Sequence, residues 1–118
     1  MLQQRRYEQR VHNGLAWLDS QKGAHPELDV RAALSSGRLD LTLLDLSDGH
    51  FCVLGQLCEG GYNRAVLFDY PDLQAFPGRT AELGFCLPAR SYGVGNSGLT
   101  REWKRQLLAL VGGTANEV

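Results

Sequence analysis

The sequence predicts a small, mainly helical protein with one domain, and a minor β-hairpin is the most strand structure that we expect. Apolar residues recur at helical spacing near both ends of the chain. A nearly continuous apolar run lies in the middle, at residues 51–58. The 118 residues suffice for one hydrophobic core. We therefore expect residues 1–111 to form a single globular domain and residues 112–118 to form a flexible tail.

The first helix is expected over residues 2–21. Four apolar residues would share its inner face at intervals of four, four and three: Tyr7, Val11, Leu15 and Leu18. Gly23 and the His25-Pro26 pair would end it, because the residue before a proline avoids helical backbone angles. A shorter helix is expected over residues 27–34, ended by the break at residues 35–37.

The middle of the chain holds one ambiguous segment and one expected core helix. Residues 39–46 alternate in part between leucine and polar residues, so either a strand or a helical turn fits them. Residues 51–58 are predicted to form the central buried helix, with Phe51 in the core. Gly55 within it costs about 1 kcal/mol relative to alanine, which indicates that another backbone approaches it closely.

The remaining elements are short until the last helix. Brief helices are expected over residues 62–68 and 80–85, with loops at residues 72–77 and 88–98. Thr100 is predicted to cap the final helix. Its apolar stripe, with Trp103 expected to be buried, would be formed by Leu99, Trp103, Leu107, Leu110 and Val111.

Charge is distributed unevenly along the chain. Residues 1–38 carry a net charge of +2, residues 39–86 carry −5 and residues 87–118 carry +2. A nucleic-acid partner is disfavoured because the basic residues are not concentrated in one segment. We expect the basic ends to complement the acidic middle. No membrane span, signal peptide or cofactor motif is present, and three cysteines without a secretion signal predict reduced thiols in the cytoplasm.

A glycine-rich loop is the main candidate binding site. Residues 93–98 read G-x-G-x-x-G in front of a helix, where backbone N–H groups can hold a phosphate. The chain is too short for the second half of a dinucleotide-binding fold. The loop is therefore either an anion or nucleotide site or only a connection. The candidate binding residues are Arg90, Tyr92, Gly93, Gly95, Asn96, Ser97, Gly98, Arg101 and Arg105.

Metal and covalent sites are less well supported. Cys52 and Cys58 are six residues apart and lack the paired spacing of a zinc site. Cys52 would stand in the first turn of its helix, where a thiol becomes more acidic, so a cysteine-dependent enzyme stays an alternative. Asp40, Asp45 and Asp48 match neither a calcium loop nor a catalytic carboxylate pair, and are expected to face solvent or cap helices.

A set of short motifs resembles small uncharacterised proteins of actinobacterial phages and prophages. These are C-V-L-G-Q-L at residues 52–57, L-G-F at residues 83–85 and L-T-x-x-W at residues 99–103. The resemblance implies a small accessory protein that binds a host protein. We therefore expect a non-enzymatic protein, such as an inhibitor of a host defence or regulatory protein. A module that holds a nucleotide or another anion is the alternative.

Overall fold

The computed structural model of the chain describes residues 2–86 and 96–112, and this part of the chain contains six α-helices and no strand. The mainly helical prediction is confirmed. In chain order the elements are α1 (Leu2–Gln21), η1 (Pro26–Leu28), α2 (Val30–Ser36), α3 (Val53–Leu57), α4 (Gly61–Arg64), η2 (Ala65–Asp69), η3 (Pro71–Gln74), α5 (Arg79–Glu82) and α6 (Asn96–Leu110).

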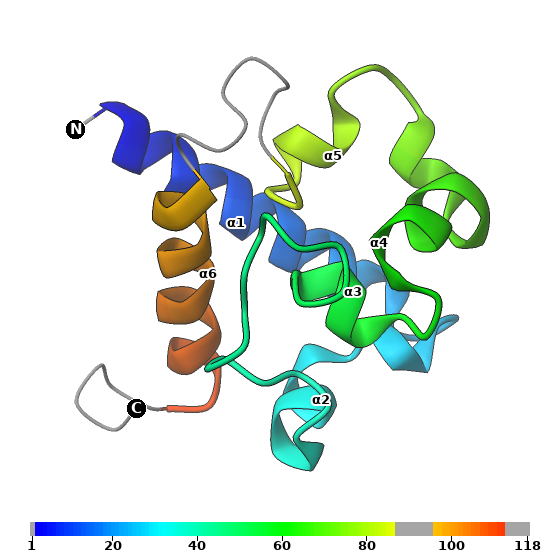
Figure 1. Ribbon diagram of the computed structural model, residues 1–118, viewed down its shortest axis with the longest axis horizontal. Helices are drawn as coiled ribbons and strands as arrows, with labels where there is room; N and C mark the ends of the chain where they lie inside the picture. Colours follow the sequence, from blue (N-terminus) through cyan, green and yellow to red (C-terminus); the bar gives the residue numbers. More distant parts are fainter. Residues whose placement is uncertain (1, 87–95, 113–118) are drawn as a thin grey trace.

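The two long helices, α1 and α6, pack against each other and organise the rest (Figure 1). Two glycines allow this close approach. A Cβ on Gly14 would lie 2.9 Å from the Trp103 ring, and a Cβ on Gly98 would lie 2.7 Å from the Tyr7 ring. Since each aromatic ring occupies the space of a missing methyl group, the helices meet at van der Waals distance.

A chain of aromatic rings runs through the core from Trp103 on α6 to Tyr70, between η2 and η3. The rings of Trp103 and Phe85 stack at 5.7 Å, and Trp17 meets Phe85 edge-on at 5.8 Å. Trp17 also meets Tyr70 edge-on at 5.9 Å. Trp103 is fully buried, as predicted, and its Nε1 donates to the carbonyl of Gly84 at 2.6 Å. The indole is thus buried with its polar atom satisfied.

The helix prediction for residues 51–58 is confirmed only for α3, which is shorter than expected. Val53, Leu54 and Leu57 are buried, but Phe51 is 42% exposed, so its predicted burial is wrong. Phe51 precedes the cap of the helix: the Sγ of Cys52 accepts the N–H of Gly55 at 3.3 Å. The backbone of Phe51 therefore lies in a turn that directs its side chain to solvent.

Residues 39–46 form neither of the two structures considered for them. They are a succession of turns in which Leu39, Leu44 and Leu46 are buried and Leu43 is exposed. The side chain of Gln56 on α3 holds this segment: its Oε1 accepts the N–H of Asp40 at 2.7 Å. This long-range bond gives a partner to a backbone N–H that no regular element satisfies, so the irregular segment can pack its leucines into the core.

The C-terminal helix begins earlier than predicted. Because α6 starts at Asn96, Thr100 lies inside the helix, and its Oγ1 accepts the N–H of Leu46 at 3.0 Å instead of capping α6. Leu99 and Leu107 are fully buried, while Val111 is 51% exposed and falls outside the apolar stripe. The predicted tail lies outside the described residues apart from Gly112. No helix in the described ranges is long and apolar enough to cross a membrane.

Candidate functional site

The predicted glycine-loop site is described only in part. Arg90, Tyr92, Gly93 and Gly95 lie outside the described residues. Asn96, Ser97 and Gly98 form the first turn of α6 rather than a loop, and Gly98 is accounted for by its contact with Tyr7.

The two predicted arginines on α6 differ in availability. Arg101 is exposed. Arg105 is bound to the buried carboxylate of Glu102, with its Nε at 3.1 Å from both carboxylate oxygens. This pairing raises the pKa of Arg105 and occupies the Nε–Nη2 edge of its guanidinium, which a bidentate anion would otherwise use. Of the two, Arg101 is therefore the better placed to receive an anion.

The thiols of α3 are unsuited to nucleophilic chemistry. Burial raises the pKa of Cys52 to about 11 and that of Cys58 to about 11. Both thiols are therefore neutral at physiological pH, although Cys52 caps a helix. The described residues hold no group of three or more His, Cys, Asp or Glu side chains arranged to bind a metal ion.

The expected pairing of basic ends with the acidic middle is not seen among the described ion pairs. Each of these pairs joins two side chains from the same third of the chain. Lys104 on α6 contributes only a weak electrostatic effect that lowers the pKa of Asp45. Much of the acidic middle therefore keeps its charge available to solvent.

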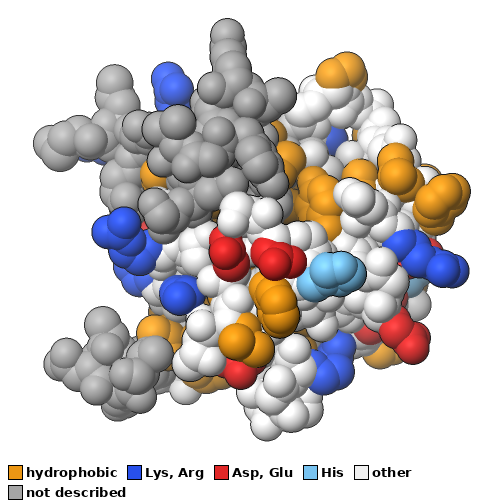
Figure 2. Space-filling model, viewed as in Figure 1, with side chains coloured by type: hydrophobic (Ala, Val, Ile, Leu, Met, Phe, Trp, Pro, Cys, Tyr) orange, Lys and Arg blue, Asp and Glu red, His pale blue; other side chains and the backbone are white. Residues whose placement is uncertain are grey.

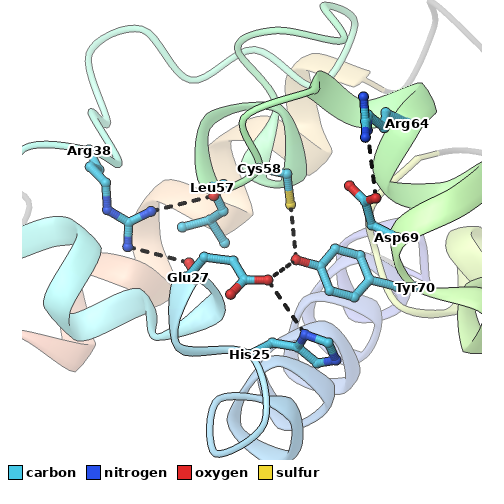
Figure 3. Close-up of polar contacts among 8 residues, drawn as sticks. All are labelled: His25, Glu27, Arg38, Leu57, Cys58, Arg64, Asp69 and Tyr70. Atoms are coloured by element: carbon cyan, nitrogen blue, oxygen red, sulfur yellow. Dashed lines mark hydrogen bonds and ion pairs between the residues drawn. The ribbon is translucent and has the colours of Figure 1, made fainter.

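A polar cleft of about 910 Å³ lies between η1, the end of α3 and α4–η2. Glu27 and Tyr70 both line it, and Figure 3 shows their side chains meeting where the Tyr70 hydroxyl donates to Glu27 Oε2. His25 Nδ1 lies 3.6 Å from the same oxygen. The Sγ of Cys58 donates to the Tyr70 hydroxyl at 3.7 Å. Three segments that are distant in sequence, at residues 25–27, 58 and 70, are thus joined by these polar contacts.

Charged side chains around the cleft form bonds that join separate elements of the fold. Arg38 donates to the backbone carbonyls of Leu57 at 3.4 Å and Glu27 at 3.3 Å, which joins η1 to the end of α3. The hydrogen bond from Tyr70 lowers the pKa of Glu27, and burial together with Glu27 raises the pKa of Tyr70. A neutral tyrosine and a charged carboxylate are therefore favoured, which suits a fixed hydrogen bond more than proton transfer.

The clearest exposed feature in the described residues is a set of large apolar side chains on η2 and in the bend after η3. We call it the Phe68 surface and define it as Leu67, Phe68 and Phe76. Phe68 is 74% exposed, Leu67 56% and Phe76 45%. Figure 2 shows apolar side chains along the right-hand edge of the molecule, over the green segment that follows α4 in Figure 1. Neighbouring exposed apolar residues such as Leu67 and Phe68 mark interaction sites more often than isolated ones.

The local backbone explains why two neighbouring apolar residues face solvent together. In η2 the N–H of Tyr70 donates to the carbonyl of Ala65, five residues earlier, at 2.9 Å. Such a π-turn rotates less per residue than an α-helix, so Leu67 and Phe68 stay on one side. π-turns are frequent at functional sites.

Bonds to the core hold the Phe68 surface in place. The side chain of Gln74 donates to the carbonyls of Val66 at 2.8 Å and Leu67 at 3.2 Å, which ties η3 to η2. The guanidinium of Arg79 lies 5.7 Å from the centre of the Phe76 ring. Arg79 is itself paired with Asp72, whose carboxylate accepts the Nε1 proton of the buried Trp17 at 2.7 Å.

Sequence reasoning missed this surface, although a signal was present. Val66, Leu67 and Phe68 are three consecutive apolar residues, and one α-helical face cannot bury all three.

In comparisons with protein-family models, with curated proteins and with solved structures, this chain matches none.

Proposed function

We propose that this chain is a non-enzymatic binding protein that recognises another protein through the Phe68 surface. The observation that supports the proposal is the exposure of two phenylalanines and a leucine within ten residues. Phenylalanine is enriched in the buried centres of protein interfaces. A small polar ligand could not cover such side chains, whereas a protein partner could.

Phe68 alone could contribute a substantial part of the free energy of binding. A phenylalanine side chain buries about 150–250 Å² when covered, and apolar burial contributes about 25 cal/mol per Å². Covering Phe68, which is 74% exposed, would therefore contribute about 3 kcal/mol before ordering costs. Gln74 and Arg79 already hold η3 and the Phe76 ring, so less conformational entropy is lost on binding.

The resemblance to small phage and prophage proteins supports a host protein as the partner. In this proposal the chain occupies a surface of a host defence or regulatory protein in the cytoplasm and inhibits it by occlusion. Such an activity needs one stable surface and no chemical step. The neutral, buried thiols of α3 agree with binding rather than covalent catalysis.

The test is quantitative affinity purification of tagged protein from host lysate, read by mass spectrometry. Phe68→Ser and Phe76→Ser should each reduce the recovered partner at least about tenfold if these residues are anchors worth more than about 1.4 kcal/mol. Val111→Ser is the matched control, because Val111 is 51% exposed but lies at the end of α6.

Equal recovery with Phe68→Ser and wild type would contradict the proposal. A nucleotide or other anion retained through purification would instead favour the site at residues 93–98. Far-UV circular dichroism of each variant checks that the helices are intact, which is expected since the exposed positions contribute little to stability.

A further inference from the structure

A second surface combines exposed apolar side chains with carboxylates, and it is formed by the turns that precede α3. We call it the acidic face and define it as Asp40, Leu43, Asp45, Asp48 and Phe51. Leu43 is 52% exposed and Phe51 42%. Figure 2 shows acidic groups beside apolar side chains in the middle of the molecule, with a histidine next to them.

The acidic face is one connected unit. Gln56 joins its two ends, because its Nε2 donates to the carbonyls of Asp40 at 3.2 Å and Phe51 at 2.9 Å. The N–H of Asp45 donates to the carbonyl of Phe51 at 3.1 Å. The N–H of Phe51 donates to the carbonyl of Asp48 at 3.1 Å. These bonds bring residues eleven positions apart in sequence onto one surface of fixed shape.

The carboxylates are held in fixed positions. The Oδ1 atoms of Asp40, Asp45 and Asp48 each accept the N–H two residues later, at 2.9, 2.9 and 2.8 Å. Bonds from Thr42 and Ser47 lower the pKa values of Asp40 and Asp45, so both are charged at neutral pH. These three bonds use Oδ1, and an ionised carboxylate has further acceptor sites on its second oxygen.

The charge around these residues is strongly one-sided. No lysine or arginine occurs between Arg38 and Arg64 in the sequence. From the packed helices, Lys104 on α6 is the cation that acts on Asp45, and its effect is the smallest of those that shift this pKa. The titratable neighbour within the segment is His50, which is exposed. Among the described residues, an approaching cation therefore meets three aspartates and little competing positive charge.

We propose that the acidic face docks a basic amphipathic segment of a partner protein. Apolar side chains of that segment would cover Leu43 and Phe51, and lysines or arginines along its edge would meet the aspartates. Charge complementarity favours this occupant over an acidic or purely apolar one. The acidic face does not include the Phe68 surface, so the two proposals can fail independently.

The test uses a fluorescein-labelled amphipathic Leu/Lys peptide of about four helical turns, measured by fluorescence anisotropy at an ionic strength of about 0.1 M, where the Debye length is about 10 Å. Wild-type protein should bind it saturably. Asp45→Asn with Asp48→Asn should weaken binding about tenfold, and Leu43→Ser with Phe51→Ser by a similar factor. Asparagine keeps the turns, because its amide oxygen accepts the same backbone N–H groups.

The matched control is Glu8→Gln with Glu82→Gln, which removes the same charge at two exposed positions outside the acidic face. It should change binding by less than about twofold, since distant surface charges are screened. A Ser/Lys peptide of equal charge should bind about tenfold more weakly than the Leu/Lys peptide.

The proposal is overturned if the control weakens binding as much as the aspartate pair does, because net charge alone would then be responsible. It is also overturned if Leu43→Ser with Phe51→Ser binds like wild type. Light scattering of the free protein gives a further check. Self-association that the Asp45→Asn and Asp48→Asn changes abolish would show that the occupant is a second copy of this chain.

Discussion

Replacing Gly55 with alanine tests the packing of α3 most sharply. A Cβ at this position would lie 2.3 Å from the carbonyl oxygen of Gly49, about 1 Å short of an ordinary contact. That oxygen already accepts the N–H of Tyr62 at 3.0 Å, so the turn cannot move freely. In an open helix the same change would stabilise the protein by about 1 kcal/mol.

The expected result is a net loss of about 2 kcal/mol in the free energy of unfolding. A contact of 2.3 Å with a bonded backbone places the cost of overpacking near the upper end of its range of about 1–3 kcal/mol, and the gain of about 1 kcal/mol in helix propensity offsets part of it. For a chain of this size that loss corresponds to a fall in Tm of about 8 °C. Urea titration followed by tryptophan fluorescence measures it, since Trp17 and Trp103 are both buried.

Gly23→Ala is the matched control, because nothing lies within 4 Å of a Cβ at that position. It should change stability by less than about 0.5 kcal/mol. The reasoning is refuted if Gly55→Ala is as stable as wild type or more stable.

Three further predictions concern the core and the polar cleft. Trp103→Phe should destabilise the protein by about 2 kcal/mol or more in urea titration, because the carbonyl of Gly84 loses its donor and a void forms; an unchanged midpoint would contradict this. Cys52 should react slowly with a thiol reagent at pH 7, since burial raises its pKa to about 11, and rapid labelling of the native protein would revive the enzyme alternative. Tyr70→Phe should destabilise the protein more at pH 7 than at pH 3. The hydrogen bond from Tyr70 lowers the pKa of Glu27 in the folded state. The stability that this bond contributes is therefore present above the pKa of Glu27 in the unfolded chain and is lost as pH falls through its pKa in the folded protein. Parallel stability curves for wild type and Tyr70→Phe across that range would disprove the linkage.

The long helices could be predicted because their signal is local. The spacing of Tyr7, Val11 and Leu18 indicates one face of α1, and these three residues are buried as predicted. Gly55 also carried usable information, because a glycine inside an apolar helix predicts a close approach, and the Gly49 carbonyl makes one.

The elements that were wrongly assigned depend on contacts far along the chain. Residues 39–46 are fixed by Gln56 on α3, and no periodicity reveals that bond. Thr100 has the chemistry of a helix cap, but its hydroxyl binds the backbone of Leu46 instead. The apolar run at residues 51–58 predicts a buried Phe51 only if the helix begins with the run. Because α3 begins after the cap at Cys52, Phe51 lies outside the helix.

The proposed binding surfaces were the least predictable part. Residues 93–98 match the G-x-G-x-x-G motif of phosphate-binding loops, but residues 96–98 belong to α6. The Phe68 surface depends on a π-turn, which has no clear sequence period. The acidic face had a recognisable local signal: an aspartate followed two residues later by threonine or serine, at residues 40–42 and 45–47, is typical of a side-chain-stabilised turn.

Site-specific photocrosslinking at position 68 tests the central claim most directly. A benzophenone amino acid replaces Phe68 in the tagged protein, and in a parallel sample it replaces Glu8, which is exposed on α1. After irradiation of host cells, we expect one protein adduct of defined mass from position 68 and none from position 8. If position 68 yields no adduct, or if both positions yield the same adducts, the Phe68 surface is not the binding site.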